Sequence, residues 1–335
     1  MKRLAFLGAM NRDVVAEIAG SVVLQQLDLD APPLIETPVS DKLAQAGASI
    51  LSSRGAAEYL GGSAFNATRI AALLNAHQPI LDLAFFGIAG QVDEGFPHLA
   101  ALRQWQIACD HVQESPLPPA TCLAMVEPAG RTLLTAIGAN AGIAAYLRDG
   151  GGTLARHLAQ SDLVHITSFL DPASPGLVAD LLLAARRHNS RLTVSLDPGA
   201  AWILPGGQGF ERLLQQTDIL HLNHEELAHF GAGPDAIISL GQRLQANWTI
   251  VARTHATVAI HEGRAGGEIV TRRLPDVPLP PTIRDSTGAG DTFCGAFLWH
   301  FATGADPLEA ARHGFATARA KIAQNGPLTP ATLPV

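Results

Sequence analysis

Short apolar runs alternate along the chain with segments in which apolar residues recur at helical spacing. We expect the apolar runs to be strands; they are 4–8, 81–88, 163–167, 192–196, 218–222 and 248–252. The expected helices between them are 63–75, 174–188, 209–216, 235–246 and 307–323. Strands that alternate with helices form a mostly parallel sheet covered on both faces. The pattern therefore predicts an α/β protein whose ligands bind at the carboxyl ends of the strands.

Two regions interrupt this alternation. Residues 13–60 mix an apolar run with a Pro-rich stretch and a polar turn. Residues 111–137 contain the runs 121–126 and 131–137, which we expect to form a hairpin with its turn near residues 128–130. From the pattern alone, the two regions are either parts of a small β unit or ordinary surface insertions.

Composition limits the functional classes. The chain has 335 residues, of which 47% are hydrophobic and 16% charged, as in a globular protein with a large core. Its net charge is −7, so no basic surface indicates nucleic acid or an anionic membrane as a partner. No apolar run is long enough to cross a membrane. The three cysteines lack motif spacing, which favours a reducing, cytoplasmic location.

Residues 285–291 are the strongest candidate for chemistry. Small residues at Gly288, Ala289 and Gly290 let backbone N–H groups approach a ligand, and a helical repeat follows them. A helix N-terminus fronted by glycines attracts anions. Asp291 lies inside this site, where a carboxylate could take the proton of an alcohol while the N–H groups stabilise a phosphoryl group. The alternative is that Asp291 only caps the helix.

Residues 285–291 resemble the C-terminal signature of the ribokinase family, the PfkB-type sugar and nucleoside kinases. Residues 61–68 resemble the N-terminal signature of this family, in the expected order along the chain. The resemblance, from about residue 4 to about residue 326, implies a single ribokinase-like domain with three α/β/α layers. It also implies a small β lid built from about 13–60 and 111–137. ATP and Mg²⁺ would be required, and a primary hydroxyl of a sugar or a nucleoside would be phosphorylated.

Several residues are candidates for binding the acceptor. Asn11 and Asp13 lie two apart after the first apolar run, so on extended backbone their side chains point the same way. An amide beside a carboxylate suits vicinal hydroxyls, although the pair could equally form a turn. Gly61 and Gly62 allow close backbone approach. The resemblance assigns these four residues and Asn66 to the acceptor.

Other residues are candidates for the nucleotide side. Asn223 and Glu226 lie three apart on one helical face and resemble the N-x-x-E motif of the family, which organises Mg²⁺ and phosphate, often through water. They also suit a helix capping box, and both interpretations can hold together. The family usually has glycines after the strand at 248–252, but here Arg253 and Thr254 follow it. We expect Arg253 to pair with a phosphate.

Two positions concern the binding of a monovalent cation and the identity of the acceptor. Asp285 either caps its loop or helps to bind a monovalent cation such as K⁺, as its counterpart does in some members of the family. Leu170 stands where sugar-specific members often have an acid, and an apolar wall there suits a nucleoside. Ribose, fructose, gluconate-type acids and nucleosides all stay open as acceptors.

Three alternatives to a monomeric kinase differ in the sequence features that they require. A nicotinamide-dependent oxidoreductase would need G-x-G-x-x-G at its first helix, but the first loop has only Gly8. A non-catalytic sugar- or nucleotide-binding sensor is favoured by the altered segment 253–256 and opposed by the intact Asp291. An exposed edge of the implied lid could pair with a second copy, so we favour a homodimer over a monomer.

Overall fold

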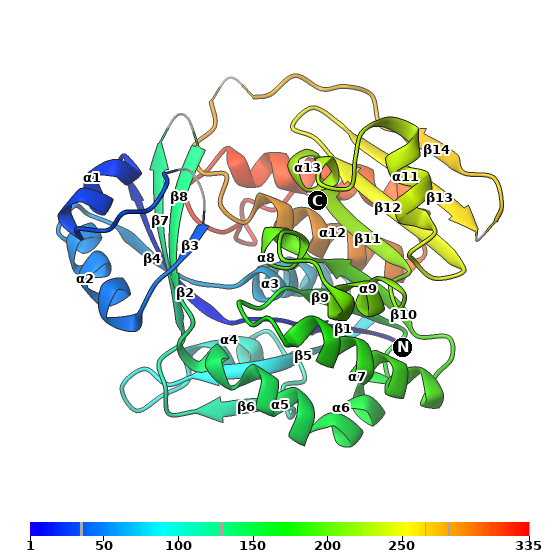
Figure 1. Ribbon diagram of the computed structural model, residues 1–335, viewed down its shortest axis with the longest axis horizontal. Helices are drawn as coiled ribbons and strands as arrows, with labels where there is room; N and C mark the ends of the chain where they lie inside the picture. Colours follow the sequence, from blue (N-terminus) through cyan, green and yellow to red (C-terminus); the bar gives the residue numbers. More distant parts are fainter. Residues whose placement is uncertain (34–35, 128–129, 265, 281, 335) are drawn as a thin grey trace.

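A nine-stranded sheet runs through the centre of the molecule (Figure 1). The computed structural model describes residues 1–334 except 34–35, 128–129, 265 and 281. The strands lie in the order β14-β13-β12-β11-β10-β9-β1-β5-β6, and all neighbours are parallel except at β13 and β14. The strands are β1 (Lys2–Leu7), β5 (Leu81–Gly90), β6 (Val112–Ser115), β9 (Leu163–Thr167), β10 (Thr193–Asp197), β11 (Ile219–Asn223), β12 (Asn247–Arg253), β13 (Val258–Arg264) and β14 (Val270–Arg273). The predicted parallel sheet is confirmed, with β6, β13 and β14 added at its edges.

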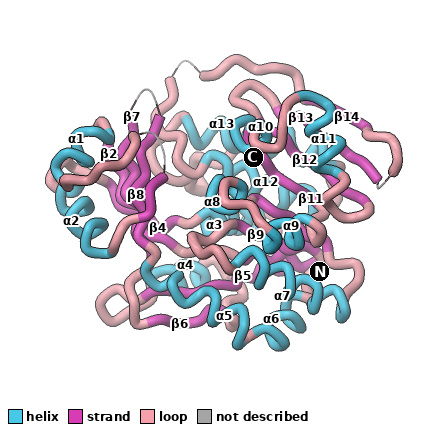
Figure 2. The backbone as a smooth tube through the Cα atoms, viewed as in Figure 1, coloured by secondary structure: helices cyan, strands magenta, loops and turns pink. Residues whose placement is uncertain are grey.

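Helices cover both faces of this sheet (Figure 2). One face carries a 3₁₀ helix (Gly138–Gly142), α5 (Ile143–Asp149), α6 (Gly151–Leu158), α7 (Ser174–His188), α8 (Gly199–Ile203), α9 (Gln208–Leu214), α10 (His224–Ala228) and α11 (Gly233–Gly241). The other face carries α3 (Ser63–His77), α4 (Pro97–Gln104), α12 (Ala289–Thr303) and α13 (Pro307–Ile322). The five predicted helices are therefore present within the three layers.

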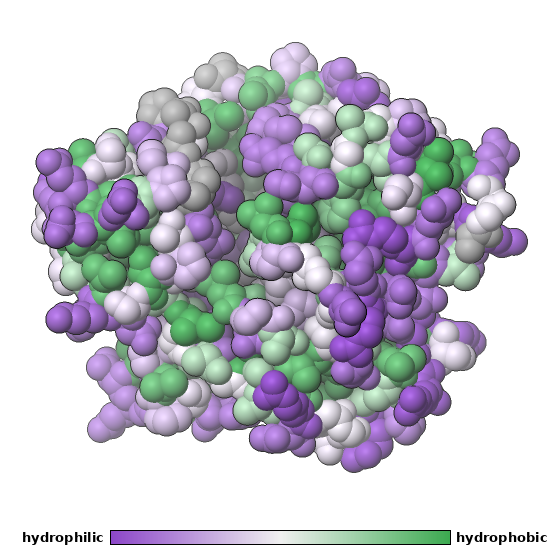
Figure 3. Space-filling model, viewed as in Figure 1, coloured by the Kyte–Doolittle hydropathy of each residue, from purple (hydrophilic) through white to green (hydrophobic). Residues whose placement is uncertain are grey.

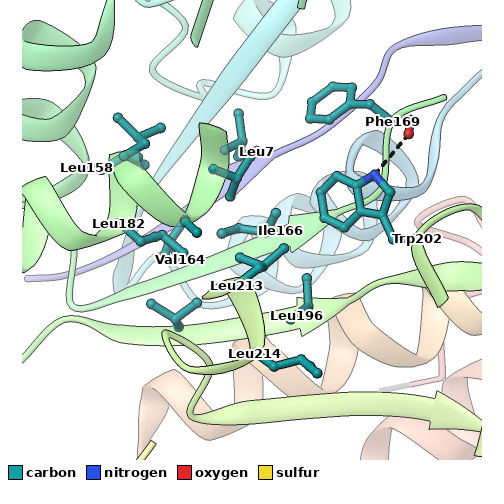
Figure 4. Packing of buried hydrophobic residues seen from close by; sticks show 14 of the residues in the cluster. Leu7, Leu158, Val164, Ile166, Phe169, Leu182, Leu196, Trp202, Leu213 and Leu214 are labelled. Atoms are coloured by element: carbon teal, nitrogen blue, oxygen red, sulfur yellow. Dashed lines mark hydrogen bonds between the residues drawn. The ribbon is translucent and has the colours of Figure 1, made fainter. Parts of the chain in front are cut away.

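Two apolar clusters hold the layers together, and β1 contributes to both. Ala5 and Leu7 pack into one cluster, whereas Leu4 and Phe6 pack into the other. Successive side chains of a strand point to opposite faces, so a strand buried on both sides is apolar throughout. Figure 4 shows the first cluster, in which the indole N–H of Trp202 donates to the carbonyl oxygen of Phe169 at 3.0 Å.

A second sheet of five strands lies at one side of the molecule, at the left of Figure 1. Its order is β3-β8-β7-β2-β4, with β2 (Asn11–Glu17), β3 (Glu36–Pro38), β4 (Ala57–Gly61), β7 (Ala120–Glu127) and β8 (Gly130–Ala136). Helices α1 (Gly20–Gln26) and α2 (Asp41–Ser52) pack on it around a core of their own. The expected hairpin is the antiparallel pair β7–β8, although residues 128–129 of its turn lie outside the described residues.

The boundaries of this small sheet differ from the expected ones in two places. The sheet starts at Asn11, because β2 pairs with β4 and β7 from that residue onward. Residues 112–115 do not belong to it, because β6 pairs with β5 in the large sheet. The region 13–60 also contains α1 and α2 besides its strands.

Among the described residues, no helix is both long enough and apolar enough to span a membrane.

Candidate active site

The two sequence motifs meet in space although they lie far apart in the chain. The side-chain amide of Asn66 on α3 donates to Oδ2 of Asp291 on α12 at 3.0 Å. Close helix packing makes this contact possible, because a Cβ at Gly295 of α12 would collide with the carbonyl oxygen of Ala67 on α3. The glycine therefore lets the two helices approach closely enough to place Asn66 against Asp291.

The predicted anion site lies at the N-terminus of α12. Gly288 precedes the helix with φ +71°, a left-handed conformation that favours glycine, and Ala289 is the first helical residue. The N–H group of Ala289 already donates to Ser286 at 3.2 Å, so a phosphate would compete for it. Asp291 lies in the first turn, where the N–H groups of a helix lack partners within the helix.

The environment of Asp291 favours its neutral form more than water would. Burial raises the pKa of Asp291, and Asp197 raises it further. The amide of Asn66 and the guanidinium of Arg131 act in the opposite direction. A carboxylate with a raised pKa is a stronger proton acceptor once ionised, which suits a general base.

The predicted acceptor residues gather where the small sheet meets α3. The carboxylate of Asp13 lies against Gly61 so closely that a Cβ at Gly61 would collide with it. Gly62 has φ +102°, and a Cβ there would collide with the carbonyl oxygen of Ala9. Packing thus requires both glycines. Burial and then Asp291 raise the pKa of Asp13 to about 7, opposed by the positive charge of Arg69.

Asn11 begins β2 in the same place. Its carbonyl oxygen lies 3.0 Å from Nε2 of His98, and its side-chain oxygen accepts a hydrogen bond from Nδ2 of Asn140 at 3.4 Å. Burial lowers the pKa of His98 to about 4, so this imidazole is neutral and can donate through Nε2. The protein therefore holds Asn11 in place at both its backbone and its side chain.

Asn223 and Glu226 form the expected capping box at the start of α10. The Asn223 side chain accepts from the Glu226 N–H at 2.8 Å, and the Glu226 carboxylate accepts from the Asn223 N–H at 2.9 Å. Burial, followed by the charge of Asp197, raises the pKa of Glu226 to about 7. The capping role leaves one oxygen of the Glu226 carboxylate outside these two hydrogen bonds.

Arg253 is held by the protein itself rather than left free for a phosphate. Its guanidinium forms an ion pair with Asp197 at 2.9 Å and donates to the carbonyl oxygen of Gly290 at 3.0 Å. Its charge is therefore fixed beside the N-terminus of α12, where a phosphate would have to share it with Asp197. Thr254 closes the turn into β13, since its hydroxyl accepts from the N–H group of Thr257 at 3.0 Å.

Asp285 caps its loop. Oδ1 accepts from the N–H group of Thr287 at 2.8 Å, which is the hydrogen bond that a loop-capping role of Asp285 requires. Oδ2 accepts from the ammonium of Lys321 at 2.8 Å and from the N–H group of Gly326 at 3.1 Å. The cation beside Asp285 is thus a side chain of α13.

Four charged residues of the site have no role that the sequence predicts: Arg69, Arg131, Asp197 and Lys321. Arg131 extends from β8 of the small sheet and donates to the carbonyl oxygen of Ser286 at 3.2 Å. Asp197 directly follows the expected strand 192–196, a position that by itself assigns it no role. Single charged residues outside a motif carry no local signal, so only the packing of distant segments could reveal them.

A recess separates the small-sheet part of the molecule, at the left of Figure 3, from the large-sheet part. A cavity of about 30 Å³ lies where β2, β4, α3 and the loop before α12 meet. Its lining includes Asp13, Asn66, Asp285, Gly288 and Lys321. Two of the predicted acceptor residues, Asp13 and Asn66, therefore line the same cavity as Gly288 of the predicted anion site.

Comparison with known proteins assigns the chain to a family. The model described as pfkB family carbohydrate kinase matches residues 38–333. The chain belongs to this family. An uncharacterized sugar kinase of Archaeoglobus fulgidus is 28% identical over 238 residues, which cover 70% of this chain and 88% of that protein. The resemblance found in the two signatures is thus confirmed, and the chain is a sugar or nucleoside kinase of the pfkB family.

Solved structures agree on the fold. The adenosine kinase of Schistosoma mansoni in complex with 2-fluoroadenosine has a TM-score of 0.78 at 12% identity and 98% coverage of both chains. A probable sugar kinase of Rhizobium etli has a TM-score of 0.76 at 18% identity, covering 99% of this chain and 96% of that one. At such low identity these likenesses establish the ribokinase-like α/β fold alone.

Proposed function

We propose that this kinase transfers the γ-phosphoryl group of ATP to a primary hydroxyl of a sugar or sugar derivative, with Asp291 as the general base. The hydrogen bond between Asn66 and Asp291 carries the proposal, because it joins the acceptor motif to the anion site. A hydroxyl next to Asp291 would lie in front of the first N–H groups of α12. Proton removal and stabilisation of the moving phosphoryl group would then occur at one point.

The two ends of the reaction are served by different residues. Asn11, Asp13, Gly61, Gly62 and Asn66 are proposed to hold the hydroxyl groups of the acceptor. On the other side, the proposed anion hole consists of the backbone at 288–290. Asn223, Arg253 and Thr254 are the proposed residues for the nucleotide.

We expect Mg²⁺ to bind together with ATP. Among the described residues, no group of three or more His, Cys, Asp or Glu side chains could hold a metal ion. A magnesium ion bound with a nucleotide takes most of its ligands from phosphates and water. Glu226 is the proposed protein partner, through water, since its carboxylate keeps an oxygen outside the capping box. Bound with ATP, the ion would neutralise phosphate charge and bring down the raised pKa of Glu226.

A nucleoside is the second candidate acceptor. The Schistosoma neighbour binds 2-fluoroadenosine, and Leu170 supplies an apolar side chain where an acid would favour a sugar. The sugar kinase of Archaeoglobus and the description of the family favour a carbohydrate. The acceptor class therefore has to be decided by assay.

We also propose a cytoplasmic location and a homodimer. Cys109, Cys122 and Cys294 are free thiols, which agrees with a cytoplasmic protein. The small sheet ends at the edge strands β3 and β4, and we propose that a homodimer forms through this sheet. Sedimentation of the purified protein would measure the oligomeric state, and a monomer at all concentrations would reject the dimer.

The first experiment measures ADP release with ATP and Mg²⁺ over a panel of pentoses, hexoses, sugar acids and nucleosides. One strong responder would identify the acceptor class. Silence over the whole panel, with ATP binding shown separately, would shift the assignment to a sensor that binds without catalysis.

The base is tested by Asp291→Asn. Turnover should fall by at least about a hundredfold while ATP binding is retained. Asp235→Asn on the exposed face of α11 is the matched control and should keep full activity. Near-normal turnover of the Asp291 variant would reject the role of Asp291.

A further inference from the structure

A buried lysine anchors the loop that leads into the anion site. The ammonium of Lys321, on the last turn of α13, donates to the carboxylate of Asp285 at 2.8 Å and to its backbone carbonyl at 2.9 Å. Lys321 is 3% exposed and Asp285 is 6% exposed. This pair therefore lies out of contact with solvent, three residues before the glycine that opens α12.

The oxygens of Asp285 are the ones that a monovalent cation would need. Proteins hold K⁺ with sets of oxygen atoms, often backbone carbonyls. Here the carbonyl oxygen and Oδ2 of Asp285 both accept from Lys321, and the N–H groups of Thr287 and Gly326 occupy the rest of the carboxylate. A cation at the carbonyl oxygen and Oδ2 would have to displace the buried ammonium, so these residues do not fit the K⁺ site that the family resemblance implies.

The electrostatics of the surroundings also oppose a second cation. The cavity of about 30 Å³ beside Asp285 is lined by Lys321 and Arg69 and also by the carboxylates of Asp13 and Asp285. The two positive side chains already offset these two carboxylates, which weakens the attraction for an entering monovalent ion. Burial tends to raise the pKa of Asp285, but the ammonium of Lys321 overcomes this and lowers it, so the carboxylate stays ionised as the partner of the lysine.

We infer that the Lys321 ammonium supplies the loop 285–288 with the positive charge that a bound K⁺ would supply, so that this enzyme works without a monovalent cation. The inference rests on the proposed kinase function. Lys321 is a positioning residue, because it acts on the anion site through Asp285 and the backbone that follows. The charge is part of the folded chain and does not vary with the ions in solution.

The test uses the wild-type protein in K⁺ and in tetramethylammonium at equal ionic strength. We expect kcat/KM to differ by less than about twofold between the two salts. The melting temperature should be the same in both, because an ion that binds only the folded state would raise it. An activation by K⁺ of more than about fivefold, or a melting temperature specifically raised by K⁺, would overturn the inference.

The variant Lys321→Ala removes the ammonium and vacates its place. We expect kcat to fall by at least about tenfold and to recover partly with K⁺ or NH₄⁺. The melting temperature of this variant should now rise with K⁺. Lys42→Ala, on the exposed face of α2, is the control and should respond to neither ion. A folded Lys321 variant with full activity would show that the charge is not needed.

The two proposals fail in distinguishable ways. If no acceptor yields ADP, the kinase proposal fails, and the melting temperatures of the wild type still report whether K⁺ binds. If ADP forms only when K⁺ is present, the kinase proposal stands and the inference about Lys321 is wrong. The wild-type comparison also decides the question if the Lys321 variant does not fold.

Discussion

Two histidines in the core should make the protein sensitive to acid. Nδ1 of His165 lies 3.0 Å from the hydroxyl of Ser195, and Nε2 of His221 lies 3.1 Å from the same oxygen. The hydroxyl can donate to one ring and accept from the other, an arrangement that two neutral rings satisfy. All three side chains are at most 1% exposed. A proton on either ring would therefore be a buried charge without a counterion in contact.

The size of the effect follows from His165. Burial lowers the pKa of His165 to about 4, against 6.5 in the unfolded chain. Above pH 6.5 both states are neutral at this residue and the full stability is present. As the pH falls from 6.5 towards 4, only the unfolded state takes up the proton, and the free energy of unfolding decreases. At about 1.36 kcal/mol per pKa unit, His165 alone accounts for about 3 kcal/mol over this window.

Urea unfolding at a series of pH values measures this loss, once refolding is shown to be reversible. Between pH 7.5 and pH 5, wild type should lose about 2 kcal/mol more than His165→Gln, which has no titrating group at this position. His188→Gln, at the exposed end of α7, is the control and should follow the wild type. Parallel pH profiles for wild type and His165→Gln would refute the assignment of a neutral, buried His165.

Two further predictions concern the site. Gly62→Ala should destabilise the fold by more than about 3 kcal/mol, because Gly62 has a positive φ and a Cβ there would collide with Ala9. Gly55→Ala, with φ +78° but open space around it, should cost only about 1–2 kcal/mol. Thermal melts compare the two variants, and equal losses of stability would contradict the predicted collision. Asn66→Ala removes a hydrogen bond that lowers the pKa of Asp291, so the acid limb of the pH–kcat profile should move to higher pH. If the acid limb of the pH–kcat profile does not move, Asn66 does not influence the pKa of the general base.

The layout of the large sheet could be predicted because its signal is local. A buried parallel strand such as β9 is a short apolar run, and a helix such as α7 repeats apolar residues every three or four positions. The edge strands β6 and β14 escaped because each has only four residues with exposed positions among them. The placing of residues 112–115 depended on pairing with β5, which no local pattern specifies.

The sequence by itself determined the family, the two signatures and the candidate base. Their glycines and aspartate stand at fixed spacing because the local backbone conformation requires these residue types there. Only the tertiary structure decided which charges neutralise one another. Arg253 pairs with Asp197, and Lys321 pairs with Asp285, across 56 and 36 residues of sequence. Such pairs depend on the packing of whole helices and strands, and an isolated lysine or arginine looks the same in sequence whether it meets solvent, a phosphate or a buried carboxylate.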